Sequence, residues 1–327
     1  MFDGSFDEPG EARAADEAER LDGATRVFVS HRELLFSIVY NLLASVADTE
    51  DVLQETWLSW TSRLQRSDEA GHEEVQNPRA YLVRIAVNHA LARRASITRR
   101  RETYVGPWLP EPLITEEMAA GPVSDTAERA LRAESVSLAM LVVLETLTPL
   151  ERAVFVLNEV FGYAHTEIAD ILKRSPSAVR QLAHRARGHV HARRPRYQTD
   201  PRVQAEVTER FIAAALGGDL SSLLEILAPD VTMWTDGGGK VRTAGLRPVA
   251  GREKVMRLLA GYANRAPHDL DIRYRPVNGD PSAVIFSAEA PYAVLVVDLE
   301  PTSDRVQGIY AVTNPDKLGS LNSDPDE

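Results

Sequence analysis

Several side chains near the middle of this 327-residue chain are of the kinds that read the bases of DNA. Arginine can pair with guanine, and glutamine with adenine, through two hydrogen bonds in the major groove. The segment 176–187 carries such side chains on the face opposite Val179 and Leu182. The candidate DNA-binding residues there are Ser177, Arg180, Gln181, His184, Arg185 and Arg187.

The sequence before this segment predicts how these side chains are presented. Residues 148–151 form a capping box with a proline at the first helical position, which marks a helix start. A short helix is expected over 167–173, followed by a turn at Arg174 and a helix cap at Ser175. Two helices joined by a tight turn, with basic side chains on the second, predict a helix-turn-helix that enters the major groove. The alternative is an ordinary helical pair with a solvated basic face.

The composition narrows the classes of function. The chain has no cysteine, so neither a disulfide framework nor a thiolate metal site is expected, and no cofactor is predicted. No apolar run is long enough to span a bilayer, so we expect a cytoplasmic protein that is not in a membrane. The net charge of -11 argues against a general nucleic-acid coat. The stretches 79–101 and 173–196 nevertheless contain no Asp or Glu, which favours local, directed DNA contact.

Composition and periodicity divide the chain into segments. Alternating apolar residues in its last third predict strands, and the helices before them make this part an α+β domain with a curved antiparallel sheet. A proline- and glycine-rich stretch is typical of an extended linker. The predicted segments are a disordered acidic arm (1–22), a helical domain (23–102), the linker (103–126), a second helical domain (127–197), the α+β domain (199–318) and a polar tail (319–327).

The first helical domain carries an acidic face. Asp51, Gln54 and Glu55 lie at positions i, i+3 and i+4, which share one side of a helix. Carboxylates on such a side can form charge-assisted contacts with arginines of a partner. The alternative is a solvated acidic face near a helix N-terminus, which the helix dipole favours by itself.

A basic helix follows in the same domain, opened by Pro78. A surface that opens a DNA duplex must neutralise phosphates and capture unstacked bases. The amide of Asn88 can both donate to and accept from a base edge. The candidate DNA-binding residues on this helix are Arg84, Asn88, Arg93 and Arg94. A merely basic surface helix is the alternative.

Taken in order, these segments resemble the extracytoplasmic-function sigma factors. Residues 51–57 are similar to the helix that docks on RNA polymerase, 78–94 to the helix that melts the minus-ten promoter element, and 148–187 to the minus-thirty-five reader. The segments 104–112, 236–240 and 314–318 look like those of the subgroup with a fused SnoaL-like C-terminal domain. The resemblance covers roughly residues 24–318.

The resemblance implies two all-α sigma domains, the second with a helix-turn-helix, and an α+β SnoaL-like cone domain. It implies a protein that binds core RNA polymerase and promoter DNA, is monomeric when free, and catalyses no reaction. It assigns the polymerase contact to Asp51, Gln54, Glu55 and Trp57. It also implies regulatory contacts between domains, for which the candidates are Trp108, Asp236, Gly237, Gly238, Gly239, Lys240, Asn314, Pro315, Asp316, Lys317 and Leu318.

Two other functions remain open at this level. One is an ordinary helix-turn-helix regulator with a ligand-sensing C-terminal domain, and the other is a SnoaL-like enzyme fused to a DNA-binding module. An enzyme needs acid–base groups gathered in a pocket. The candidates are Trp234, Asp236, Tyr262, His268 and Tyr274, and strand alternation does not bring them together.

Overall fold

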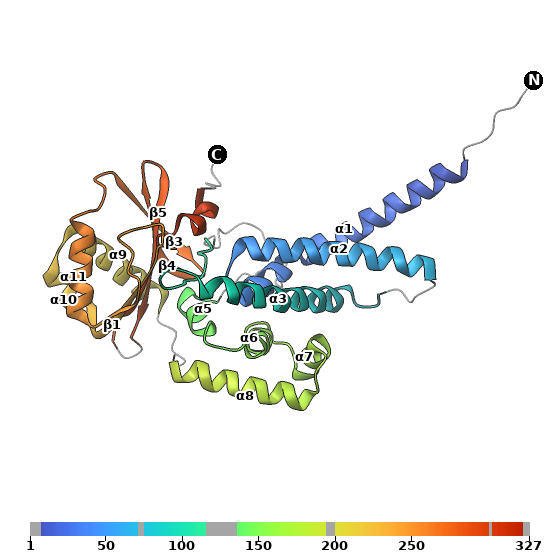
Figure 1. The fold of residues 1–327 in the computed structure, drawn as a ribbon, viewed down its shortest axis with the longest axis horizontal. Helices are drawn as coiled ribbons and strands as arrows, with labels where there is room; N and C mark the ends of the chain where they lie inside the picture. The colour runs from blue at the N-terminus through green and yellow to red at the C-terminus, as the bar shows by residue number, and fades with distance from the viewer. Residues whose placement is uncertain (1–7, 71–74, 116–135, 194–199, 301–302, 323–327) are drawn as a thin grey trace, which may run out of the picture.

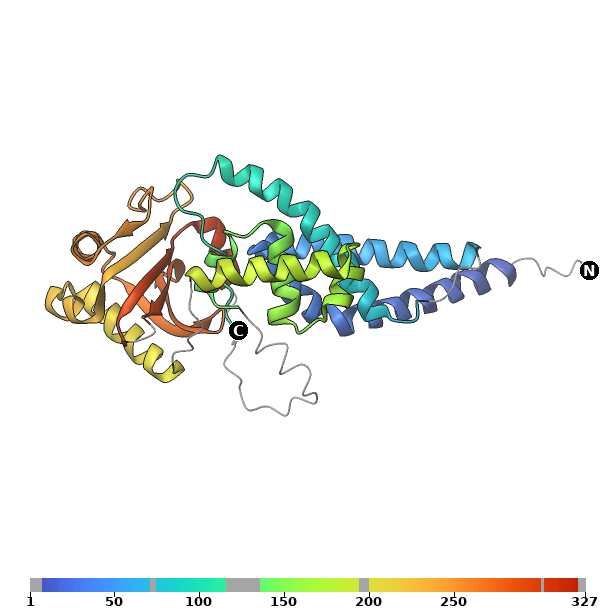
Figure 2. The same cartoon turned by 90° about the horizontal axis from the view of Figure 1, so that it is seen from below.

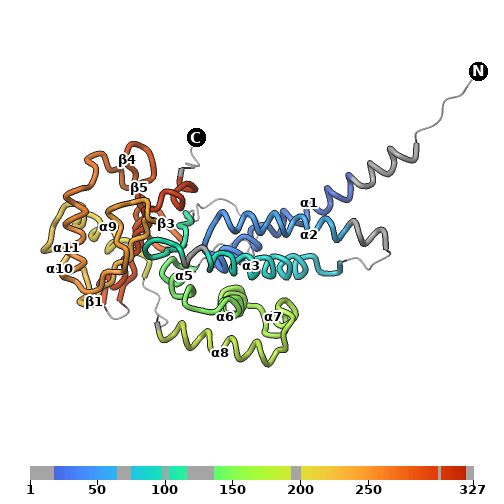
Figure 3. Tube along the Cα trace, in the orientation of Figure 1, coloured from blue at the N-terminus to red at the C-terminus, as the bar shows by residue number. Residues whose placement is uncertain are grey.

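The computed structural model describes residues 8–70, 75–115, 136–193, 200–300 and 303–322. A helical half and a half built on a β-sheet lie side by side along the longest axis of the molecule (Figure 1). The tube view shows the same two halves along the Cα trace, coloured from blue at the N-terminus to red at the C-terminus (Figure 3). Within the described part of the chain, no helix combines the length and apolar character that crossing a bilayer requires.

The N-terminal helical domain consists of α1 (Glu8–Leu43), α2 (Val46–Ala70) and α3 (Pro78–Glu102), each of which contacts the other two. Apolar side chains recur along them at spacings of three and four residues, which places these side chains on one face of each helix. The stripe on α1 is formed by the fully buried Leu35, Ile38, Val39 and Leu42. The helices therefore pack lengthwise around a shared core.

The N-terminal arm differs from the prediction of disorder over residues 1–22. Helix α1 already begins at Glu8, while residues 1–7 lie outside the described residues. The segment 11–20 is rich in Ala, Glu and Arg, which are strong helix formers. Extending an existing helix avoids the cost of nucleating a new one, so a charged segment joined to a packed helix continues it.

The second helical domain begins with α5 (Leu138–Leu144) and α6 (Pro149–Phe155), and α6 runs on into a π-helical turn, η1 (Val156–Val160). The predicted capping box is present at the start of α6. Thr148 N donates to Glu151 Oε2 at 3.2 Å, and Glu151 N donates to Thr148 Oγ1 at 3.3 Å. Two orphan donors of the first turn are thereby satisfied.

The helix-turn-helix is formed by α7 (His165–Leu172) and α8 (Pro176–Arg193). Lys173 makes the turn with a left-handed φ of 51°, one residue earlier than predicted. Ser175 Oγ accepts from Ala178 N at 3.2 Å and caps α8 as expected. The fold class predicted for this half is confirmed.

The C-terminal domain has an α+β fold, also as predicted. Its sheet has six strands in the order β2-β1-β6-β5-β4-β3. Most neighbours are antiparallel, but β1 and β6 run parallel, so the prediction of an antiparallel sheet is wrong for this pair. The elements are α9 (Pro201–Gly217), α10 (Leu220–Ile226), β1 (Leu227–Asp236), β2 (Val249–Ala250), α11 (Arg252–Ala263), β3 (Leu270–Val277), β4 (Asp280–Ser287), β5 (Ala290–Leu299) and β6 (Val306–Val312).

The two faces of this sheet are covered by different parts of the chain. Helices α9 and α11 cover one face and bury Phe211 and Val255 against it. The other face meets Leu109 of the linker and Leu138 of α5, and it lies toward the helical half (Figure 1 and, turned by 90°, Figure 2). The sheet therefore serves as a platform on which the linker and the second helical domain rest.

The short helices η2 (Pro315–Lys317) and η3 (Gly319–Asn322) close the described part of the chain. The prediction of a polar tail over 319–327 is wrong for its first part. Leu321 is only 4% exposed and packs on the linker-facing side of the sheet. A single apolar residue among polar ones is enough to anchor this segment, because it lies next to an uncovered apolar surface.

Two buried arginines lie where the helical domains meet. Arg152 of α6 is fully buried, donates from Nε to Asn41 O at 2.8 Å, and pairs with Glu145. Arg94 of α3 donates to Leu42 O at 2.7 Å and pairs with the same carboxylate at 3.1 Å. Burial lowers the pKa of Arg94 to about 10. One carboxylate thus compensates two guanidinium groups that have left water.

Replacing this carboxylate should destabilise the protein strongly. We expect Glu145→Gln to lower the free energy of unfolding by about 3–5 kcal/mol, since both buried arginines lose their counter-charge. Urea unfolding followed by circular dichroism measures this effect. Glu225→Gln on the exposed side of α10 is the matched control, and equal midpoints for the two variants would contradict the prediction.

Candidate functional site

The acidic face of α2 is present on the surface. Asp51, Gln54 and Glu55 are all exposed on one side of the helix. Arg93 of α3 pairs with this face: its Nε lies 2.9 Å from Asp48 Oδ1, and its other nitrogens reach Asp51 and Glu55. The hydrogen bond from Arg93 to Asp48 raises the arginine pKa. Arg93, predicted to contact DNA, is thus tied to residues predicted to contact polymerase.

Trp57 lies on a different side of α2 from these acidic residues. It is partly buried, and its ring meets that of Phe28 edge-on at a centroid distance of 5.3 Å. This placement makes Trp57 a support for the helix. Leu58, which the sequence analysis missed, is 63% exposed beside the acidic face. Its position seven residues after Asp51 was the available signal, because i and i+7 share a helix side.

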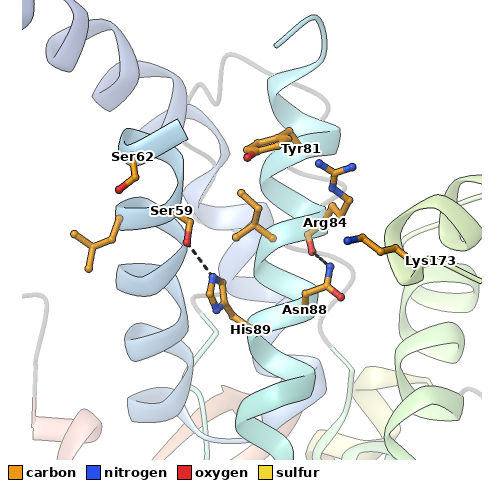
Figure 4. A pocket seen from close by; sticks show the side chains of 9 residues that line it. Ser59, Ser62, Tyr81, Arg84, Asn88, His89 and Lys173 are labelled. Atoms are coloured by element: carbon orange, nitrogen blue, oxygen red, sulfur yellow. Dashed lines mark hydrogen bonds between the residues drawn. The ribbon is translucent and has the colours of Figure 1, made fainter. Parts of the chain in front are cut away.

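A groove of about 620 Å³ runs between α2 and α3 and reaches the end of α7 (Figure 4). Two of the candidate DNA-binding residues, Arg84 and Asn88, project into it from α3 (Figure 4). The Arg84 guanidinium lies over the Tyr81 ring at 5.0 Å, and Asn88 Nδ2 donates to Arg84 O at 2.7 Å. On the opposite wall, Ser59 Oγ lies 3.1 Å from His89 Nε2.

This groove combines the groups that capture an unstacked base. An aromatic ring provides a stacking surface, a guanidinium provides charge, and amide and hydroxyl groups provide hydrogen bonds. Ser59, Tyr81 and Lys173 also line this groove and were not among the predicted candidates. Tyr81 was detectable in principle, since it precedes Arg84 by three and Asn88 by seven residues.

Arg94 differs from its predicted role as a phosphate contact. It is only 5% exposed and is held inside the protein by Leu42 O and Glu145. In this arrangement it joins the two helical domains. Local sequence could not reveal this, because Glu145 pairs with Arg94 from 51 positions further along the chain.

The helix-turn-helix leans on the groove. Asn88 Nδ2 lies 3.4 Å from Ile171 O of α7, and Lys173 lines the groove directly after that helix. The Arg79 guanidinium lies 5.9 Å from the centre of the Tyr163 ring. The groove is therefore in contact with α7, the first helix of the helix-turn-helix.

The predicted base-reading face of α8 is exposed to solvent. Ser177, Arg180, Gln181 and His184 all lie on it. Arg185 and Arg187 are exposed too, but each forms an ion pair with an earlier helix. Arg185 Nε lies 3.0 Å from Glu151 Oε1 of α6, and Arg187 Nη1 lies 3.1 Å from Glu159 Oε1 of η1. These two arginines hold α8 against α6 and η1.

Asp236 organises the contact between the linker and the C-terminal domain. This carboxylate, at the end of β1, is fully buried. It accepts hydrogen bonds from Leu109 N at 2.8 Å, from Lys317 Nζ at 2.7 Å and from the hydroxyl of Tyr104. Burial and the Asp236 carboxylate raise the pKa of Tyr104. Asn314 donates from Nδ2 to Tyr104 Oη at 2.9 Å. We use the name linker clamp for the following set: Tyr104, Trp108, Leu109, Asp236, Asn314 and Lys317.

Trp108 lies over Lys317 in this clamp. The ammonium nitrogen is 3.4 Å from the centre of a Trp108 ring, and the Tyr104 ring meets Trp108 edge-on at 4.8 Å. Lys317 also donates to Leu109 O. A cation–π contact away from water contributes on the order of 2 kcal/mol. The linker thus completes the surroundings of a buried lysine.

Two glycines after Asp236 allow this close approach. Gly238 and Gly239 have φ of 58° and 73°, which L-residues with side chains rarely adopt. A Cβ on Gly238 would lie 2.5 Å from Asn314 Nδ2, and one on Gly239 would lie 2.9 Å from Val105 Cβ. Gly237 is equally confined, since its Cβ would lie 2.4 Å from Ala244 Cβ.

The remaining candidates of the regulatory set border the clamp. Lys240 pairs with Asp316 at 2.6 Å on the surface, where an ion pair contributes little. Pro315 begins η2, and Leu318 is buried in the apolar cluster with Leu109. The structure therefore brings the whole predicted set together. Tyr104 and Leu109 were missed, the latter because a backbone contact leaves no side-chain signal.

The next linker residues bind the N-terminal domain as well. Tyr40 Oη of α1 donates to Glu111 O at 2.6 Å and accepts from Asn278 Nδ2 at 2.7 Å. Asn278 N donates to Leu113 O at 2.8 Å. Val46 N donates to Glu111 Oε2 at 2.8 Å, so the linker caps α2. The part of the predicted linker from 116 to 126 lies outside the described residues.

Comparison with known proteins connects these surfaces to a family. Residues 27–101 match the family Sigma-70 region 2, and residues 137–190 match Sigma-70, region 4. The chain is 35% identical over 301 residues to the ECF RNA polymerase sigma factor SigJ of Mycobacterium tuberculosis, covering 89% of this chain and 92% of that protein. The chain belongs to the ECF RNA polymerase sigma factors.

Two further comparisons extend over this sigma factor's length. It is 28% identical over 307 residues to the probable ECF RNA polymerase sigma factor SigI of Mycobacterium tuberculosis, covering 93% of this chain and 97% of that protein. The crystal structure of Mycobacterium tuberculosis SigJ superposes with a TM-score of 0.66 at 31% identity, covering 90% of this chain and 97% of that one. The likeness thus includes the C-terminal domain.

The residues considered for catalysis in this sigma factor are not gathered in one pocket. Only Tyr262 lines the cavity inside the C-terminal domain. Trp234 stacks on Tyr310 on the other face of the sheet, and Asp236 belongs to the clamp. His268 and Tyr274 are exposed.

The exposed position of Arg180 on α8 predicts a role in base reading. In the sigma factor bound to core polymerase, we expect Arg180→Ala to reduce discrimination between the correct upstream element and single-base variants by about 1–3 kcal/mol. Competition binding with these duplexes measures the loss. Arg257→Ala on the exposed side of α11 is the control. A uniform loss for all duplexes would instead make Arg180 a phosphate contact.

Proposed function

We propose that this sigma factor docks on core RNA polymerase through the acidic face of α2, with Asp51, Gln54, Glu55 and Leu58. The α2–α3 groove then holds bases of the minus-ten element, and α8 reads the minus-thirty-five element. The protein thereby directs transcription initiation in the cytoplasm. The match to Sigma-70 region 2 supports this over an ordinary helix-turn-helix regulator, in which the docking face and the groove would have no task.

We further propose that the C-terminal domain restrains this activity through the linker clamp. The main support for this proposal is the contact between the groove and the helix-turn-helix, in which Asn88 Nδ2 lies 3.4 Å from Ile171 O. Elements centred near minus ten and minus thirty-five are separated by about 85 Å of duplex, at about 3.4 Å per base pair. Helix α3 of the groove contacts α7, and α8 follows α7 after a tight turn, so the groove and the base-reading face belong to one packed body. Such a body does not reach both elements, so the described arrangement must open.

The C-terminal domain holds this closed arrangement at two places. Its sheet binds the linker through Asp236 and Lys317, and it binds α5 of the second helical domain through Leu138. A domain that stabilises the closed state shifts the population away from the open, promoter-binding state. The C-terminal domain would thus regulate its own chain, because it contacts the closed arrangement more extensively than the open one.

A catalytic role for the C-terminal domain has less support. Acid–base catalysis requires a carboxylate, histidine or similar group at the reacting position. Among the described residues that line its cavity there is no Asp, Glu, His or Lys. We therefore propose a non-catalytic, regulatory domain.

Tyr104→Phe tests the restraint, because it removes one hydroxyl from the clamp and leaves the C-terminal domain intact. A hydrogen bond to a charged group contributes about 1.5–3 kcal/mol, so the open population and the transcript yield should rise by about tenfold to a hundredfold, until the open state predominates. The measurement is transcription in vitro with sigma-free core polymerase and genomic DNA, followed by sequencing of transcript starts.

Tyr274→Phe makes the same change at an exposed site on β3 and serves as the control. Discrete starts that share two upstream motifs are expected with every form. Equal transcript yield from Tyr104→Phe and Tyr274→Phe would show that the clamp does not restrain transcription. If no form of the protein produced new transcript starts, the proposed roles of the groove and of α8 in promoter reading would be wrong.

A further inference from the structure

A second cavity lies within the C-terminal domain, on the sheet face opposite the linker clamp. Its volume is about 110 Å³. Side chains from α9, α11 and the strands β1, β4, β5 and β6 form its inner wall, and these side chains are buried in the domain core. They include Phe211, Ile212, Met233, Leu259 and Ile285, each at most 5% exposed.

The cavity opens to solvent at a polar rim. Thr243, Arg265 and Tyr292 line it and are exposed, so a small molecule can enter at this side. Tyr262 Oη donates to Thr243 O at 3.0 Å, which fixes the loop at the rim. Arg265 is the one charged residue in the lining, and within the described chain no carboxylate forms an ion pair with its guanidinium.

This combination specifies the chemistry of a ligand. An apolar enclosed wall favours a hydrocarbon body, and a few polar groups at one end fix its orientation. An engineered apolar cavity of about 150 Å³ holds a benzene molecule, so a cavity of this size holds a body of similar dimensions. An unpaired guanidinium at the rim forms its strongest hydrogen bonds with a carboxylate.

We propose that the C-terminal domain binds a small apolar carboxylic acid, with its hydrocarbon body in this cavity and its carboxylate at Arg265. The ligand class is a short aliphatic or single-ring aromatic acid. No group in the wall would react with it, so it acts as a bound effector. This proposal of a binding site depends only on the cavity and on Arg265.

The same strands carry the cavity wall and the clamp. Thr235 of β1 lines the cavity, and its neighbour Asp236 holds the linker. Thr313 lines the cavity, and its neighbour Asn314 donates to Tyr104. Thr313 N and Asn314 N both donate to Asp236 O, at 2.8 and 2.9 Å, which joins the two strand ends. A ligand that moves these ends therefore changes the clamp, a coupling that rests on the regulatory function proposed above.

Calorimetric titration of the full-length protein with hexanoate, hexan-1-ol and hexylamine tests the site. We expect hexanoate to bind in a saturable way, and to bind tighter than the other two compounds. Arg265→Gln should weaken hexanoate binding by about tenfold or more, since a charge-assisted hydrogen bond is lost, and leave hexan-1-ol unchanged. Arg257→Gln, on α11 shortly before Arg265 but outside the lining, should bind all three like the unaltered protein.

A second variant blocks the cavity without touching the charge. Ala266→Leu places a larger side chain at the half-buried edge of the lining and should abolish hexanoate binding. The proposal is overturned if none of the three compounds binds at millimolar concentration. It is also overturned if all three bind equally and Arg265→Gln or Ala266→Leu changes nothing.

Fluorescence separates binding from coupling. Trp108 lies against Lys317, so hexanoate should change the emission of the full-length protein and leave that of Trp108→Phe unchanged. Saturable binding with no change in emission would refute the coupling and support the site. An unaltered transcript yield in Tyr104→Phe, together with binding, would refute the restraint by the clamp and leave the ligand site standing.

Discussion

The buried pair between Asp236 and Lys317 is the interaction on which the arrangement of this sigma factor depends. Both side chains have left water, which is costly unless every hydrogen-bonding group is satisfied. The C-terminal domain does not satisfy them alone: Leu109 supplies a backbone donor and acceptor, and Tyr104 supplies a hydroxyl. The domain core therefore includes a piece of the linker. A linker held in this way determines which face of the sheet is covered and where the helical domains begin.

A second buried charge cluster strengthens the closed arrangement. Unlike the pair of Asp236 and Lys317, it carries more positive than negative charge. Glu145 compensates Arg94 and Arg152, and these three residues come from different helices of two domains. A cluster with two cations and one carboxylate stabilises the interface less than a balanced one would. An interface of this kind specifies one alignment of the helices and separates at lower cost than a balanced one, which suits the opening proposed above.

Local signals predicted much of the fold. The capping box at Thr148, the cap at Ser175 and the apolar spacing of α1 act within a few residues, so the sequence reveals them. The resemblance brought Asp236 and Lys317 into one set, although they are distant in the chain. Contacts between segments distant in the chain were not predictable: Glu145 pairs with the buried Arg94, and Arg93 is captured by the acidic face of the neighbouring helix. The parallel pairing of β1 with β6 depends on the path of the whole domain, which strand periodicity does not contain.

Glu111 of the linker carries a further consequence. Its carboxylate accepts from Val46 N, so the first turn of α2 is capped by a residue 65 positions further along the chain. Burial raises the pKa of Glu111, a sign that the carboxylate sits there against a cost in hydration. When the linker leaves, α2 keeps the bond from Asp48 N to Ser45 Oγ, but the amide of Val46 loses its acceptor. The start of α2 and the path of the linker are thus one thermodynamic unit, and fraying at Val46 would report linker departure.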